Sequence, residues 1–63
     1  MYESGNDRYI QWIQKGLYEH VGSAYAPYYN LYAAAQHLFR MGYHFISEIP
    51  DREIDYALGR FHF

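Results

Sequence analysis

The sequence predicts an all-α fold with two principal antiparallel helices and a short C-terminal helix. Three observations predict it. Apolar side chains recur at helical spacing in three segments, a glycine follows each of the first two, and a proline with acidic residues opens the third. With 63 residues the chain is too short for two domains, so residues 1–63 are expected to form one small domain.

The first helix is predicted over residues 7–21. Asn6 or Asp7 can cap it, because either side chain can accept a hydrogen bond from a free N–H of the first turn. Gly16 is a weak point inside this helix, and Gly22 is the expected stop. Apolar and charged residues lie on opposite sides of the helical wheel. The apolar side is Ile10, Ile13, Leu17 and Val21, and the charged side is Arg8, Lys15 and Glu19.

The second helix is predicted over residues 27–41, after a connection at 22–27. Pro27 suits its first turn, where the missing N–H costs nothing. The three alanines at 33–35 favour a helix and keep one side slim, so that another helix can approach closely. Gly42 is expected to end it. Its apolar stripe is Tyr28, Leu31, Ala35, Leu38 and Phe39.

A third, short helix is predicted over residues 51–60. Pro50 and Asp51 suit a helix start, because proline needs no donor there and acidic side chains are favoured in the first turn. Residues 43–49 before it fit either a short extended segment or a further helical turn. The predicted helix over residues 51–60 is so short that it needs packing against the rest of the protein to persist. Its apolar face is Ile54, Ala57, Leu58 and Phe61.

The small size of the chain predicts self-association. A chain this short buries only about 60% of its unfolded surface, and the hydrophobic gain nearly equals the conformational entropy that folding removes. The sequence contains no cysteine, so no disulfide can add stability. We therefore expect two copies to pack into a homodimeric helical bundle.

Composition argues against several classes of partner. The formal net charge is -2, and the basic residues are scattered, so a surface for nucleic acid is not expected. No apolar run approaches the ~18 residues that span a membrane, and the start MYESGNDRY lacks the features of a signal peptide. We expect a cytoplasmic protein. A nucleic-acid-binding regulator of helix-turn-helix type remains the alternative, although the connection at 22–27 is longer than its usual turn.

No catalytic, cofactor or metal site is predicted. A zinc site needs closely spaced ligands, and the histidines do not provide them: they are His20, His37, His44 and His62, with no pair four residues apart on a helix. Acid–base and nucleophilic catalysis need a rigid scaffold and a pocket, which a short helical chain offers poorly. The separated glycines follow no strand, so they form no phosphate-binding loop.

The aromatic residues, 22% of the chain, are the most informative feature. Trp12, Tyr29 and Tyr56 fall on otherwise polar helical faces, and we predict that they contact a second chain. Most other aromatic side chains are expected to fill the core. Tyr28, Tyr32 and Phe39 could form a base-stacking platform, but the acidic balance of the chain favours packing within the protein.

The whole chain resembles the small early proteins of lambdoid bacteriophages. The resemblance rests on the length, on the opening MYESGNDRYIQWIQKGL and on the closing IPDREIDYALGRFHF. It implies a non-enzymatic regulatory factor that favours lytic over lysogenic development, with a helical, dimeric fold. It also implies a host or phage protein as the partner, in the cytoplasm of a bacterial host. No residue role is transferred by it.

Overall fold

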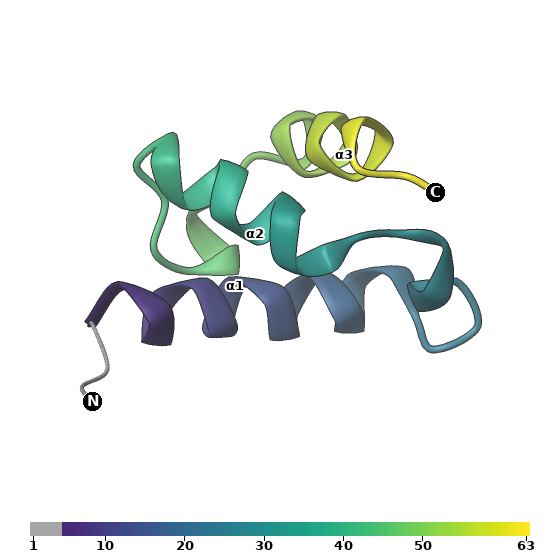
Figure 1. Ribbon diagram of the computed structural model, residues 1–63. Coiled ribbons are helices and arrows are strands. Elements are labelled where there is room, and N and C mark those ends of the chain that lie inside the picture. Colours follow the sequence, from purple (N-terminus) through teal and green to yellow (C-terminus); the bar gives the residue numbers. More distant parts are fainter. Residues whose placement is uncertain (1–4) are drawn as a thin grey trace.

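The computed structural model describes residues 5–63, which form three α-helices and two short 3₁₀ helices (Figure 1). α2 runs antiparallel to α1 and lies between α1 and α3, contacting both. The predicted all-α fold is therefore confirmed for the described residues. The elements are α1 (Gly5–Val21), η1 (Ala26–Tyr28), α2 (Leu31–Arg40), η2 (Ile46–Glu48) and α3 (Asp51–Arg60).

Two glycines end the first two helices, as predicted. Gly22 follows α1 with a φ of 83°, and Gly42 follows α2 with a φ of 105°. Side chains with a Cβ rarely adopt this left-handed conformation, so glycine is the residue that lets the chain turn away from a helix end. At the other end, α1 begins at Gly5 rather than at residue 7.

The predicted start of the second helix at residue 27 is wrong. Pro27 lies in η1, and Tyr29 is extended, with φ -128° and ψ 144°. α2 begins only at Leu31, where the Asn30 side chain caps the helix by accepting a hydrogen bond from the Ala33 N–H at 3.1 Å.

The C-terminal segment explains the late start of α2. The Asn30 N–H donates to the Phe61 carbonyl at 2.7 Å, and the Phe63 N–H donates to the Tyr28 carbonyl at 2.8 Å. These two bonds form a short antiparallel bridge around Tyr29 and His62. The extended backbone that this bridge requires at residue 29 interrupts the helix that Pro27 was expected to open.

The segment 43–49 combines the two conformations that the sequence allows. Phe45 is extended, with φ -136° and ψ 145°, and one 3₁₀ turn follows at Ile46–Glu48. The helix after it, α3, has the predicted bounds of residues 51–60. Its acidic first turn and Arg60 in its last turn suit the helix dipole.

The core is aliphatic, contrary to the expectation that aromatic side chains fill it. Alanines of α2 and α3 occupy buried positions where larger side chains could stand, namely Ala34, Ala35 and Ala57, and rings pack only against the edge of the core. The aromatic side chains of the described residues are therefore half-buried or exposed. The buried residues are Ile10, Ile13, Leu17, Leu31, Ala34, Ala35, Leu38, Ile49, Ile54, Ala57 and Leu58.

Candidate protein-interaction surface

Trp12 lies on the outer side of α1, where 43% of its surface is exposed. Its indole stacks on the ring of Phe45, with centroids 5.2 Å apart and planes inclined by 22°. Tyr9 meets Trp12 edge-on at 5.4 Å and Phe45 edge-on at 5.8 Å. The exposed indole is thus held in place by a ring from the same helix and a ring from the segment before η2.

Further rings extend this group along the surface. Tyr9 stacks on Phe39 at 6.2 Å, and His44 meets Tyr9 at 4.8 Å and Phe39 at 5.2 Å. We call the five residues Tyr9, Trp12, Phe39, His44 and Phe45 the tryptophan cluster. Of these five, sequence reasoning singled out only Trp12 as an interface residue, because Phe39 comes from α2 and His44 and Phe45 from the segment after it. No local pattern brings them together.

Glu48 holds the two loop members of the cluster in place. Its carboxylate oxygen Oε1 accepts hydrogen bonds from the backbone N–H of His44 at 2.9 Å and of Phe45 at 3.1 Å. These two bonds hold the pKa of Glu48 below its ordinary value, since they favour the charged carboxylate, and His44 adds a smaller electrostatic contribution. The position of Phe45 against Trp12 therefore depends on an ionised Glu48.

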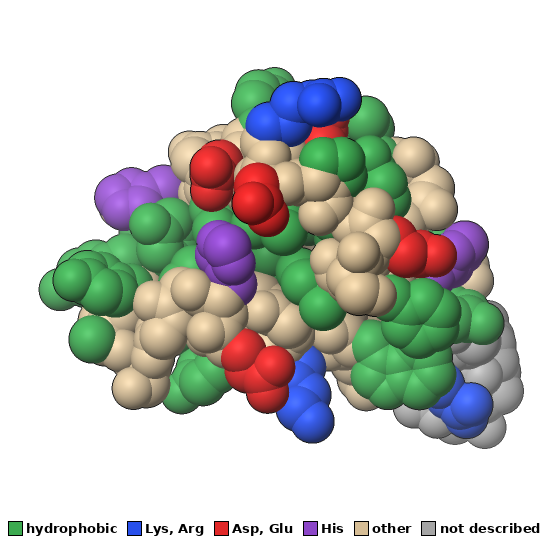
Figure 2. Space-filling view, turned by 180° about the vertical axis from the view of Figure 1, so that it is seen from behind, with side chains coloured by type: hydrophobic (Ala, Val, Ile, Leu, Met, Phe, Trp, Pro, Cys, Tyr) green, Lys and Arg blue, Asp and Glu red, His purple; other side chains and the backbone are tan. Residues whose placement is uncertain are grey.

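Hydrophobic side chains gather over the N-terminal half of α1 in the space-filling view, with a basic side chain at their edge (Figure 2). Among the cluster residues, Trp12 and Phe45 are the large hydrophobic side chains with the greatest exposure, at 43% and 42%. An exposed group of rings fixed by mutual contacts is typical of protein-binding surfaces.

A stripe of charges follows Trp12 along the outer side of α1. Arg8, Lys15 and Glu19 are exposed like Trp12 itself. The steps from residue 8 to 12, 15 and 19 are four, three and four residues, so all four side chains fall within about 60° of one helix face. We call these four residues the α1 stripe.

Tyr29 is not on a helical face, so the wheel argument for it is wrong. It is half-buried and packs against the core. Its backbone forms the bridge with His62, and the two rings meet edge-on at 5.0 Å. Tyr29 therefore joins the C-terminal segment to the start of α2.

Tyr56 lies on α3 with 57% of its surface exposed. Its ring is 6.0 Å from that of His37 on α2. Because α2 separates α3 from α1 (Figure 1), Tyr56 and Trp12 belong to different surfaces. The structure does not bring the three predicted interface residues together.

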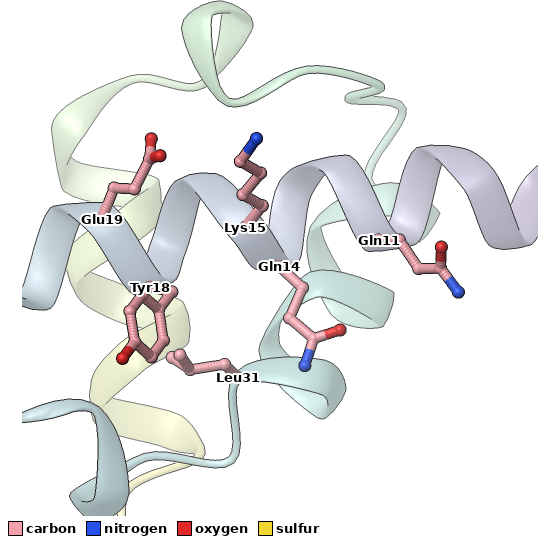
Figure 3. Close-up of a pocket in the computed structure, with 6 residues that line it drawn as sticks. All are labelled: Gln11, Gln14, Lys15, Tyr18, Glu19 and Leu31. Carbon is pink, nitrogen blue, oxygen red and sulfur yellow. The ribbon is translucent and has the colours of Figure 1, made fainter. Parts of the chain in front are cut away.

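Two adjoining hollows lie beside α1, which sequence reasoning did not detect. The first, of about 480 Å³, is lined by residues of α1 and by Leu31 (Figure 3). The second, of about 460 Å³, shares Gln14, Tyr18 and Leu31 with it. We call the second hollow the tyrosine groove. Its other lining residues are Ala26, Pro27, Tyr29, Asn30, Tyr32 and Phe63.

Three of the four histidines make ring contacts. His37 lies 5.9 Å from Phe61, His44 belongs to the tryptophan cluster, and His62 meets Tyr29. Within residues 5–63, no three His, Asp or Glu side chains are grouped so that they could hold a metal ion.

The described helices and the comparisons with known proteins add two findings. Over residues 5–63, no helix has both the length and the apolar character needed to cross a membrane. No protein-family model, curated protein or solved structure matches this chain.

Proposed function

We propose that this chain is a non-enzymatic regulatory protein that acts through protein–protein contacts in the cytoplasm of a bacterial host. Its resemblance to the small early proteins of lambdoid phages supports a role in favouring lytic over lysogenic development. The observation that carries the interaction role is the tryptophan cluster, in which Trp12 and Phe45 stack while more than two fifths of each stays exposed.

The cluster suits an interface because its rings are already ordered. Binding normally costs side-chain entropy, and rings that hold one another in place reduce that cost. Tryptophan and tyrosine also supply most binding free energy where they become fully buried. Trp12 is thus a preorganised anchor for a second chain.

We further propose that the first such chain is another copy, docked along the α1 stripe. If two α1 helices pair in antiparallel orientation with residue 12 opposite residue 15, residue 8 lies opposite residue 19. Arg8 then faces Glu19 of the partner subunit, and Trp12 faces Lys15 of the partner subunit. Because the spacing of these four residues is symmetric, a two-fold axis at their midpoint forms each of the two pairs twice.

The homodimer leaves Tyr56 free on α3, on the other side of α2 from α1 (Figure 1). This second surface is the one we assign to the host or phage partner. The regulator acts there by occluding or recruiting that protein.

The test is Trp12→Ala, with Tyr25→Ala as the matched control. Tyr25 is 62% exposed and lies in the loop before η1, outside the cluster. Sedimentation equilibrium should show self-association weakened by about tenfold or more for Trp12→Ala and unchanged for the control. Unchanged self-association of Trp12→Ala contradicts the proposal. A gel shift of DNA at low salt would instead favour a nucleic-acid-binding regulator.

A further inference from the structure

Four aromatic side chains from separate parts of the chain surround the tyrosine groove. Tyr18 comes from α1, Tyr29 from the bridge, Tyr32 from the first turn of α2, and Phe63 from the C-terminal segment. Three of them are open to solvent, with exposures of 49% for Tyr18, 42% for Tyr32 and 76% for Phe63. The hollow, of about 460 Å³, is shallow and lies wide open to solvent.

The rings of the groove differ from those of the tryptophan cluster in how they are used. Every ring of the cluster packs on another ring of the cluster. In the part of the chain from residue 5 to 63, the rings of Tyr18, Tyr32 and Phe63 make no contact with another aromatic ring. These three side chains therefore add exposed aromatic surface to the lining of the hollow.

The charge around the groove indicates which kind of occupant it fits. None of the residues that line it is a Lys, Arg, His, Asp or Glu. Aromatic faces carry a partial negative charge, so a lining of four rings without a cation attracts a positive group. Lys15 and Glu19 line the adjoining hollow, and their charged ends point to the side of α1 away from Tyr18 (Figure 3). Among residues 5–63, the one lysine is Lys15, and its ammonium group does not line the tyrosine groove.

We propose that the tyrosine groove binds a small soluble molecule that carries a trimethylammonium group. Such a group combines a positive charge with an apolar surface of methyl groups. The methyl groups fit a hollow lined by rings, Pro27 and Leu31, and they make the cation less costly to dehydrate than a lysine ammonium. This ligand site is independent of the tryptophan cluster and of the α1 stripe.

The test compares choline with its uncharged carbon isostere, neohexanol, on the intact chain. Backbone amide shifts are followed by NMR, and sodium chloride holds the ionic strength constant. Choline should give saturable shifts at residues 28–32 and 61–63, and neohexanol should bind about fivefold more weakly or worse. Equal affinity for the two compounds, or no saturable shift with choline, overturns the proposal.

Variants at two exposed tyrosines locate the site. Tyr32→Leu removes a ring of the groove, and Tyr56→Leu removes a ring of similar exposure on α3. We expect choline affinity to fall about fivefold in the first variant and to stay unchanged in the second. Amide spectra of both variants establish that they are folded. Equal affinities in the two variants contradict a site in the groove.

Discussion

Ile46 packs against the backbone of Gly16 so closely that a Cβ atom at residue 16 would lie 2.6 Å from the Ile46 Cβ. Real side chains do not reach this distance, so the glycine lets η2 dock on α1. The residue that weakens the helix by its own propensity therefore allows a tertiary contact. That contact places the segment that carries Phe45 beside Trp12.

Gly16→Ala should destabilise the fold by about 1–3 kcal/mol, because the new methyl group clashes with Ile46. Gly59→Ala is the matched control: Gly59 is also helical, but an added Cβ has nothing within 4 Å. There the same change should stabilise the protein by about 0.5–1 kcal/mol. Urea unfolding followed by circular dichroism measures both.

A double variant separates the clash from any general effect on α1. Ile46→Gly removes the atoms that Ala would meet at residue 16. Gly16→Ala combined with Ile46→Gly should therefore lose less stability than the sum of the two single variants. Additive losses would mean that the cost at Gly16 has another origin.

Acid should loosen the loop that carries Phe45. The lowered pKa of Glu48 means that its stabilising contribution is present above the unfolded-state value, near 4.5, and is lost as the pH falls through the folded-state pKa. Glu48→Gln removes the ionisation and keeps an acceptor oxygen. The stability difference between the parent chain and Glu48→Gln should therefore shrink below pH 4.5.

Trp12 fluorescence gives a local readout of the same change. Because Glu48 positions Phe45 and Phe45 covers one side of Trp12, the indole should become more exposed when Glu48 is protonated. Its emission should shift to longer wavelength in acid in the parent chain. A pH-dependent shift of the same size in Glu48→Gln would assign the effect to another group.

The α1 stripe predicts a charge-reversal experiment. Arg8→Glu should weaken self-association, because it places two acidic groups opposite each other across the proposed interface. Adding Glu19→Arg restores opposite charges and should recover most of the affinity, while Glu19→Arg alone weakens it. Sedimentation equilibrium at low and high salt measures the effect, which salt should reduce. No recovery in the double variant rules out the antiparallel pairing.

The side chain of Asn30, which caps α2, should contribute to the stability of the fold although it is exposed. Asn30→Ala removes the acceptor for the Ala33 N–H, and such losses cost about 1 kcal/mol. Asn30→Asp keeps the acceptor and adds a favourable charge at the helix start, so its stability should be equal or higher. Thermal unfolding compares the two variants, and equal losses in both would show that the cap is not the cause.

The three helices could be predicted from the sequence because their causes are local. The apolar spacing, Gly22 and Gly42 at the ends, and Pro50 before the third helix all act within a few residues. The start of α2 could not be predicted in this way. It depends on two hydrogen bonds, from the Asn30 N–H to the Phe61 carbonyl and from the Phe63 N–H to the Tyr28 carbonyl, which the chain order does not reveal.

The surface residues divide in the same way, into those that local sequence patterns place correctly and those that only the tertiary structure places. The helical wheel predicts that Trp12 and Tyr56 lie outside the core, since their helices form with nearly the predicted bounds. The wheel fails for Tyr29, which is extended. The members of the tryptophan cluster and of the tyrosine groove come from different elements, so only folding brings them together.

The sequence by itself determined the fold class, the helix ends marked by glycine and the aliphatic faces of the three helices. The tertiary structure alone decided that aliphatic side chains and alanines fill the buried positions while rings stay half-buried or exposed. Ala34, Ala35 and Ala57 are buried between the helices, and Gly16 lets η2 dock on α1. The aromatic excess is therefore displaced to the surface, where it forms the cluster around Trp12 and the groove beside Tyr18.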